Sequence, residues 1–275
     1  MFDIAIVGAG PAGLSAAVTA RQRGLEVLVI SRKDARGWLA RAERIDNYPG
    51  LPHVSGPELL AALSAHAKDM GAQFMEGMVQ QILPMGNAFS LAIGSEYIDA
   101  RRVILCMGAR QPRLLPGEEA LLGRGVSYCG TCDGMLYRGK AVAVVAESAE
   151  AVHEANYLAG LAAHVRYFGK PDAALDPAIE VIDEKPAAVE GESRVSALVT
   201  SAGRYEEDGV FIFRDAMALD TLLPGLAHDG PFIRVDRGMH TSLAGVFAAG
   251  DCAGKPLQVA KAVGEGCVAA LSAAE

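Results

Sequence analysis

Long apolar runs are missing from this sequence of 275 residues, and none reaches the roughly 18 residues that a membrane-spanning helix needs. No basic segment with a following apolar stretch and cleavage site stands at the start, so we expect no secretory signal peptide. Cysteine is also scarce, and five cysteines are an odd number, which is not typical of a secreted disulfide framework. We therefore expect a cytoplasmic protein without membrane contact, in which any disulfide is transient and catalytic.

An excess of positive charge is missing as well. The formal net charge is −8, which argues against nucleic acid as a main partner. The charge is uneven, since residues 21–50 carry seven Lys/Arg against four Asp/Glu, whereas residues 171–230 carry four against thirteen. Two faces for different partners and ordinary solvated surface are both compatible with this pattern. With 51% hydrophobic residues, the chain can bury a sizeable core in one or two domains.

Two of the few cysteines, Cys129 and Cys132, lie close together in the stretch Cys-Gly-Thr-Cys. This spacing lets both sulfurs meet across one turn and lowers a thiol pKa, as redox chemistry needs. Asp133 follows directly and is a candidate proton carrier. The alternative is half of a zinc site, but that site needs a second ligand pair. The remaining cysteines are scattered singly and are interpreted as small core residues: Cys106, Cys252 and Cys267.

A glycine-rich turn, Gly8-Ala9-Gly10-Pro11-Ala12-Gly13, stands near the start of the chain. We predict a strand over Phe2–Val7 before it, and a helix over Leu14–Arg23 and a strand over Glu26–Ile30 after it. In this setting the turn is typical of dinucleotide binding. Gly8 permits the tight turn, Gly10 lets a pyrophosphate approach, and Gly13 lets helix and strand pack closely. Ser31-Arg32 replaces the usual acidic residue, so we expect other groups to hold the ribose.

Hydrophobic periodicity predicts further elements before residue 112. Ser55–Gly71 reads as a helix with its apolar positions on one face, and Asp46–Gly50 reads as a turn before it. A buried strand is expected at Val103–Leu105. Short strands of a covering sheet are expected at Ala72–Ile82, Phe89–Ile93 and Tyr97–Asp99.

A second strand–turn–helix–strand unit follows a proline-containing linker at about Pro112, with elements predicted at Ala141–Ala146, Ala149–Ala162 and Val165–Phe168. Its turn, Ala146–Ala151, contains no glycine where a phosphate should approach. Near the end, an apolar strand leads into Gly250-Asp251, which places a carboxylate where a flavin's ribityl chain could bond. A final helix is expected from about Gln258.

Together these pieces resemble the low-molecular-weight thioredoxin reductases over nearly the whole chain. The resemblance rests on Gly8–Gly13, Asp46–Gly50, Gly125–Gly134 and Gly245–Asp251. It implies an α/β fold of two doubly wound Rossmann-like domains. An FAD domain, residues 1–112 and 241–275, is interrupted by a smaller disulfide-bearing domain, residues 113–240. The resemblance also implies a homodimer that passes electrons from FAD to the internal disulfide and then to thioredoxin.

The same resemblance implies roles for individual residues. Cys132 would be the sulfur nearest the flavin, Cys129 would attack the partner's disulfide, and Asp133 would be the acid–base group. Leu257 replaces the arginine that usually precedes Gln258. No metal site is expected. The positions expected to bind the cofactor are Gly8, Gly10, Pro11, Ala12, Gly13, Asn47, Gly108, Gly250, Asp251, Gln258 and Val259.

Two departures from the family pattern concern the electron donor. In the family, the second domain binds NADPH through a glycine-rich turn and grips its 2′-phosphate with a His-Arg-Arg stretch. Here those positions read Ala146–Ala151 and Tyr167–Lys170. Glu147 would place a carboxylate beside the pyrophosphate, where Coulomb repulsion opposes binding. The sequence is therefore most similar to the ferredoxin-dependent flavin thioredoxin reductases, and reduced ferredoxin is the expected donor.

Three alternatives stay open at this point: an NADPH-dependent reductase with altered contacts, a related flavoprotein fed by another flavin, and a flavin redox sensor without turnover. The early basic stretch is a candidate docking face for an acidic ferredoxin. It comprises Arg32, Lys33, Arg36, Arg41 and Arg44. Trp38 replaces a family glutamine near the flavin and is expected either to cover the ring or to pack in the interior.

Overall fold

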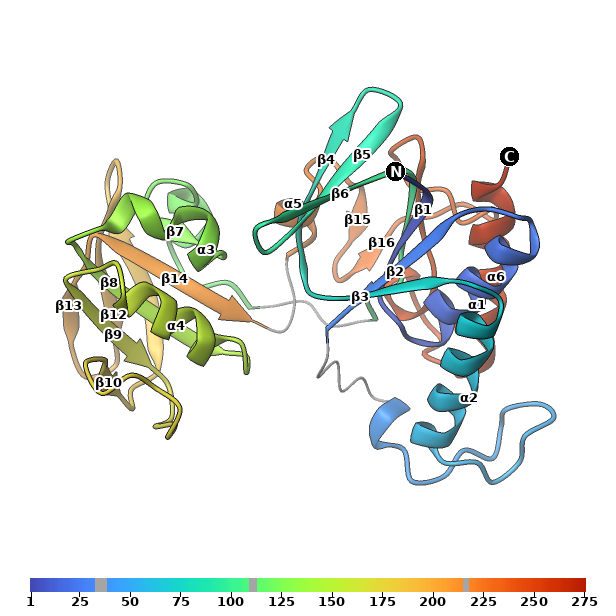
Figure 1. The fold of residues 1–275 in the computed structure, drawn as a ribbon, viewed down its shortest axis with the longest axis horizontal. Helices are drawn as coiled ribbons and strands as arrows, with labels where there is room; N and C mark the ends of the chain where they lie inside the picture. Colours follow the sequence, from blue (N-terminus) through green and yellow to red (C-terminus); the bar gives the residue numbers. More distant parts are fainter. Residues whose placement is uncertain (33–38, 109–112, 215–217) are drawn as a thin grey trace. The chain divides into compact units, whose positions relative to one another are not determined.

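The computed structural model describes residues 1–32, 39–108, 113–214 and 218–275, which form two compact units (Figure 1). The first unit combines Met1–Gln111 with Leu219–Glu275, and the second is Pro112–Ala218. The chain therefore leaves the first unit once and returns to it. The return comes at Leu219, whereas we expected it at 241 from the sequence. The reason is that short elements before 241 belong to the first unit. Helix α5 (Leu219–Leu222) packs against β4 (Val79–Met85), and β16 (Phe232–Ile233) packs against η4 (Gly250–Ala253).

The first unit is built on one seven-stranded sheet in the order β3-β2-β1-β6-β5-β4, with β17 also paired to β6. Strands β1, β2, β3, β6 and β17 pair in parallel, and β4 and β5 continue the sheet antiparallel. A short antiparallel pair, β15 (His228–Asp229) and β16, lies apart from it. The strands of the sheet are β1 (Phe2–Val7), β2 (Val27–Ser31), β3 (Gln73–Glu76), β4 (Val79–Met85), β5 (Ala88–Ile93), β6 (Glu96–Leu105) and β17 (Val246–Ala248).

The expectation of a separate covering sheet is wrong. The predicted strands at Tyr97–Asp99 and Val103–Leu105 are two parts of one strand, β6. Strand β5 pairs with β6, and β4 pairs with β5, so both belong to the same sheet. The sequence divides β6 because most of its first half is exposed, whereas its last three residues are buried. One continuous strand therefore carries two different hydrophobic patterns.

Helices of the first unit lie where the sequence places them, within a few residues. They are α1 (Pro11–Gln22), α2 (Gly56–Asp69) and α6 (Val259–Ala273), with single turns η1 (Leu39–Arg41) and η4 (Gly250–Ala253). A capping box of Ser55 and Glu58 fixes the start of α2. Helices α1 and α6 pack side by side (Figure 1), and a Cβ on Gly266 would overlap the backbone of Ala12. This close packing fixes the amino end of α1 against the C-terminal segment.

The second unit has a five-stranded parallel sheet in the order β10-β9-β8-β14-β7. Alternate residues of β8 face opposite sides. Val142 and Val144 pack with α4, whereas Ala143 and Val145 pack with a three-stranded antiparallel sheet, β11-β12-β13. The elements are η2 (Glu119–Leu121), β7 (Val126–Ser127), α3 (Gly130–Asp133), η3 (Gly134–Tyr137), β8 (Ala141–Glu147), α4 (Ala151–Ala159), β9 (His164–Phe168), β10 (Glu180–Ile182), β11 (Pro186–Gly191), β12 (Val195–Thr200), β13 (Arg204–Glu206) and β14 (Gly209–Arg214).

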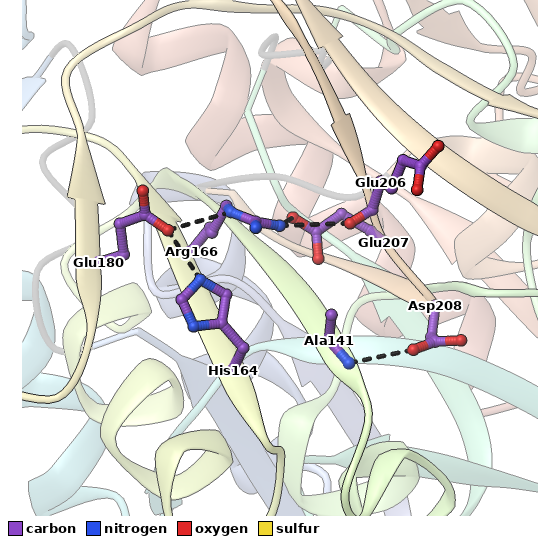
Figure 2. A network of polar contacts seen from close by, with 7 residues as sticks. All are labelled: Ala141, His164, Arg166, Glu180, Glu206, Glu207 and Asp208. Atoms are coloured by element: carbon purple, nitrogen blue, oxygen red, sulfur yellow. Dashed lines mark hydrogen bonds and ion pairs between the residues drawn. The ribbon is translucent and has the colours of Figure 1, made fainter.

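A polar network ties together the amino-terminal ends of the strands in this sheet (Figure 2). Arg166 on β9 donates to Glu180 on β10 at 3.0 Å and to the buried carboxylate of Glu207 at 2.7 Å. The ring of His164 lies 2.7 Å from the same Glu180 carboxylate. Because ligands of doubly wound sheets bind at the carboxyl ends of the strands, this network is structural, and the site must be sought at the opposite edge.

Candidate functional site

The glycine-rich turn between β1 and α1 has the geometry of a phosphate cradle. Gly8 has φ of +112°, which favours glycine, and a Cβ there would overlap the carbonyl of Cys106. A Cβ on Gly13 would overlap the carbonyl oxygen of Gly8, so helix and turn are in direct contact. At Gly10, by contrast, a Cβ would meet no atom within 4 Å, which leaves open space in front of the turn.

The amino end of α1 faces this open space without a side-chain cap. Gly10 is the N-cap residue, Pro11 occupies the first turn, and among the described residues no side chain caps the helix. The amides of such a helix start bind phosphate well. Gly10, Pro11, Ala12 and Gly13 therefore fit the pyrophosphate of a dinucleotide.

Two glycine substitutions should have different effects at this turn. We expect Gly13→Ala to lower the free energy of unfolding by about 1–3 kcal/mol, because its Cβ meets backbone that cannot move aside. Gly10→Ala should leave the fold unchanged but weaken dinucleotide binding about tenfold or more, because its Cβ would enter the open space where we expect the pyrophosphate. Thermal unfolding and the absorbance of bound flavin measure the two effects. Equal loss of stability in both variants would contradict this reading of the turn.

The C-terminal segment brings further predicted residues to the same unit. Gly250 has φ of +84°, and a Cβ there would lie 2.8 Å from that of Ala12, so the Gly250-Asp251 turn lies against the start of α1. Asp251 is partly buried, and burial raises the pKa of its carboxyl. Lys261 on α6 donates to the carbonyl of Gly250 at 2.9 Å and steadies this turn. Asp251 therefore lies in the single turn η4, three positions after the end of the apolar strand β17.

Two predicted residues far apart in the sequence meet directly. The side-chain amide of Asn47 donates to Oε1 of Gln258 at 2.7 Å, across 211 positions of sequence. Asn47 precedes a turn closed by the Leu51 amide on the Tyr48 carbonyl, and Gln258 is the N-cap residue of α6, before Val259. Gly108, the remaining predicted position, has φ of +77° shortly after β6. The first unit therefore supplies a donor set that fits a dinucleotide.

The two cysteines of the second unit form a disulfide, with Cα atoms 5.3 Å apart. Cys129 is the N-cap residue of α3, and the amide of Cys132 donates to its sulfur at 3.1 Å. Such a hydrogen bond stabilises negative charge on the sulfur. Cys129 is 8% exposed, whereas Cys132 is exposed. Cys132 is thus the more accessible sulfur, and the hydrogen bond from the Cys132 amide would favour Cys129 as the leaving thiolate.

Asp133 is held by a short chain of hydrogen bonds. The hydroxyl of Ser127 donates to Asp133 at 2.7 Å and accepts from the amide of Cys129 at 3.1 Å. Ser127 was not recognised from the sequence, although it lies only two residues before the first cysteine. It couples the carboxylate of Asp133 to the backbone of the redox motif.

An ion pair occupies the carboxyl edge of the second sheet. Glu147 ends β8 and Arg214 ends β14, and these neighbouring strands lie in register. The guanidinium of Arg214 donates to Glu147 at 2.6 Å and makes a two-pronged contact with Glu118, including one bond of 2.8 Å. Glu118 is fully buried and Arg214 is 5% exposed. Of these residues, the sequence pointed only to Glu147.

The same network reaches the redox motif. The hydroxyl of Tyr128, next to Cys129, donates to Glu118 at 2.8 Å, and the amide of Leu115 donates to the other oxygen of Glu118 at 2.7 Å. Burial and the Glu118 carboxylate raise the pKa of the Tyr128 hydroxyl, which stays protonated. The edge where a second nucleotide would approach is therefore filled by a buried, hydrogen-bonded group of side chains.

Other predicted residues have more ordinary surroundings. Cys106 and Cys252 are buried, and burial raises the pKa of Cys252 to about 11, so both are core residues as expected. Cys267 is partly buried. Of the candidate docking face, Arg41 is exposed and Arg44 is paired with Asp46 at 2.8 Å. Lys33, Arg36 and Trp38 lie outside the described residues.

Within the described ranges, no group of three or more His, Cys, Asp or Glu side chains is arranged to hold a metal ion. Among the helices that the structure describes, none is both long and apolar enough to cross a membrane.

Known proteins share this architecture. The model of the pyridine nucleotide-disulphide oxidoreductase family matches residues 2–184 and 178–266. The thioredoxin reductase of Bacillus subtilis (strain 168) is 33% identical over 295 residues, which cover 99% of this chain and 93% of the relative. A ferredoxin-flavin thioredoxin reductase from Clostridium acetobutylicum has a TM-score of 0.88 at 42% identity, covering 99% of this chain and 96% of the other. A thioredoxin reductase from Gloeobacter violaceus has a TM-score of 0.82 at 29% identity, covering 99% and 93%.

Proposed function

Because this chain belongs to the pyridine nucleotide-disulphide oxidoreductase family, we propose that it passes electrons from reduced ferredoxin to thioredoxin through FAD and the Cys129–Cys132 disulfide. The chain is an oxidoreductase and a flavoprotein, and FAD is its cofactor. When bound, FAD supplies a group that can accept electrons singly and deliver them in pairs. The proposal includes a homodimer that works in the cytoplasm, where catalytic disulfides are reduced and reformed.

The main argument about the electron donor comes from the Arg214–Glu147 ion pair at the carboxyl edge of the second sheet. Strand β8 leads through α4 to β9 on one side, while β14 lies on the other, so the edge between β8 and β14 is a topological switch point. A nucleotide would bind there, but the edge carries Glu147 and a buried Arg214 held by two carboxylates. A pyrophosphate would have to displace this pair and lie beside Glu147. This supports a donor other than NADPH.

The residues of the redox motif would then act in order. Two electrons delivered at the exposed Cys132 sulfur would break the S–S bond and leave two reduced sulfurs, with the Cys129 thiolate stabilised by the Cys132 amide. Cys129 would then attack the thioredoxin disulfide and release one thioredoxin sulfur, which takes up a proton that Asp133 would carry. Cys132 would attack the resulting mixed disulfide, which releases the second thioredoxin sulfur and re-forms the Cys129–Cys132 bond. The energetics allow the transfer. A donor near about −400 mV feeding a thioredoxin near about −270 mV is downhill by roughly 6 kcal/mol for two electrons.

Anaerobic mixing experiments test the donor. We expect NADPH to leave the flavin absorbance unchanged, because its binding edge is filled, and we expect reduced ferredoxin to produce thioredoxin thiols at a steady rate. Reduced ferredoxin and thioredoxin without the enzyme form the control. Rapid bleaching of the flavin by micromolar NADPH would show that the nucleotide uses other contacts, and the donor assignment would be wrong. Flavin reduction by ferredoxin without thioredoxin thiols would instead indicate a redox sensor.

A further inference from the structure

A partly buried carboxylate that the scheme above does not use lies against the redox motif. Oε2 of Glu154, on α4, accepts a hydrogen bond from the amide of Gly130 at 3.0 Å. Gly130 and Thr131 are the two residues between the cysteines. Glu154 therefore binds the backbone of the motif itself, from helix α4, which begins 19 positions after Cys132.

The contact is close because position 130 is glycine. A Cβ on Gly130 would overlap Oε2 of Glu154, so a larger residue there would push the carboxylate away. Burial raises the pKa of the Glu154 carboxyl, and the Gly130 amide opposes that rise. The other charged groups that act on it are His153 and Glu150, both on α4 or at its start. On α3 the nearby acidic residue is Asp133, which is held by Ser127 instead.

The position of Glu154 affects the charge that Cys129 can carry. Amides at the start of a helix after the first cysteine stabilise its thiolate. The Cys132 amide donates to the Cys129 sulfur at 3.1 Å and the Thr131 hydroxyl lies 3.4 Å from that sulfur, whereas the Gly130 amide donates to Glu154. Glu154 also adds its own negative charge at this point. Like charges repel more strongly away from bulk water, so a thiolate beside this carboxylate is disfavoured.

We infer that Glu154 is a positioning residue of the redox pair, which fixes the backbone between the cysteines and disfavours negative charge on the Cys129 sulfur. Reduction adds two electrons, breaks the S–S bond and leaves two sulfurs that take up two protons when both become thiols. A group that disfavours the thiolate shifts this equilibrium toward the disulfide, and so lowers its reduction potential. The inference rests on the proposed function only in that Cys129–Cys132 is the redox centre.

Glu154→Gln tests this in the flavin-loaded protein, because glutamine keeps the size and an acceptor oxygen but removes the charge. In a Cys132→Ser background, reduced with dithiothreitol, the rate of Cys129 alkylation by iodoacetamide is followed against pH by peptide mass spectrometry. The pH at which the alkylation rate is half-maximal should fall by about one unit in the Glu154→Gln protein. This corresponds to a tenfold gain in Cys129 thiolate at pH values below the pKa. Glu192→Gln removes the same charge from an exposed turn of the same unit and should leave the midpoint unchanged.

A second measurement uses the intact cysteine pair. Redox titration with dithiothreitol, at a pH above the Cys129 midpoint, should show a tenfold shift of the Glu154→Gln protein toward the dithiol, or about 30 mV for two electrons. Gly130→Ala displaces the Glu154 carboxylate without deleting it. This variant should also lower the pH midpoint of Cys129 alkylation and shift the redox equilibrium toward the dithiol. Unchanged midpoints in folded Glu154→Gln and Gly130→Ala proteins, or an equal shift in Glu192→Gln, would overturn the inference. Neither readout uses ferredoxin, NADPH or thioredoxin, so an error in the donor does not affect them.

Discussion

Cys132→Ser is expected to lower steady-state reduction of thioredoxin by about a thousandfold or more while the flavin absorbance is retained. Without the second sulfur no disulfide forms, so no group in the chain can accept an electron pair and pass it to the substrate. Thioredoxin thiols formed with reduced ferredoxin are the measurement. Cys267→Ser is the matched control, since it removes a partly exposed cysteine of α6 that forms no disulfide in the structure. A comparable loss in that variant would point to general damage by serine.

The two single-cysteine variants also separate the roles of the sulfurs. Cys129 keeps the hydrogen bond from the amide of residue 132 in the Cys132→Ser protein, so we expect it to form a stable mixed disulfide with thioredoxin. The Cys129→Ser protein should form little. The structure makes this a demanding test, because Cys129 is buried in the oxidised state and Cys132 is exposed. The reduced motif must therefore expose Cys129, and trapping through Cys132 alone would reverse the assignment.

Local patterns in the sequence predict the parts of the site that depend on neighbouring residues. The strand over Phe2–Val7 is confirmed, and so are the close contacts predicted for Gly8 and Gly13, because the atoms concerned belong to the same strand–turn–helix segment or to Cys106, directly after β6. The role of the turn in binding stays a prediction. The redox pair is confirmed as a disulfide, since its two sulfurs meet across one turn. The contact of Asn47 with Gln258 is different, because only the resemblance to a family placed both residues at one cofactor.

Features that depend on strand pairing could not be predicted. Arg214 lies 96 residues from Glu118, and nothing in its local sequence shows that β14 pairs with β8 so that Arg214 meets Glu147. Glu154 lies on the expected helix, but its contact with Gly130 depends on how α4 packs against α3. The early return at Leu219 was missed because short elements such as α5 carry too little periodicity to reveal their packing partner.

Arg214→Leu is expected to lower the free energy of unfolding by about 3–5 kcal/mol, because it leaves the carboxylate of Glu118 buried without its cation. The hydroxyl of Tyr128 and the amide of Leu115 would remain as partners of Glu118, but neither carries a compensating charge. Chemical denaturation of the flavin-loaded protein measures the change. Arg204→Leu is the matched control in the same unit: Arg204 pairs with Glu190 at the surface, so its loss should cost about 1 kcal/mol or less.

A double variant shows whether the buried charge is the cause. Adding Glu118→Gln to Arg214→Leu removes the unpaired carboxylate, and we expect it to recover most of the lost stability. If the double variant is no more stable than Arg214→Leu, the loss comes from packing around the arginine side chain. If Arg214→Leu costs no more than Arg204→Leu, the ion pair contributes little to the fold. The expected result has a consequence for the donor: if Glu118 needs Arg214 as its cation, Arg214 is held at the carboxyl edge beside Glu147, where a pyrophosphate would have to lie.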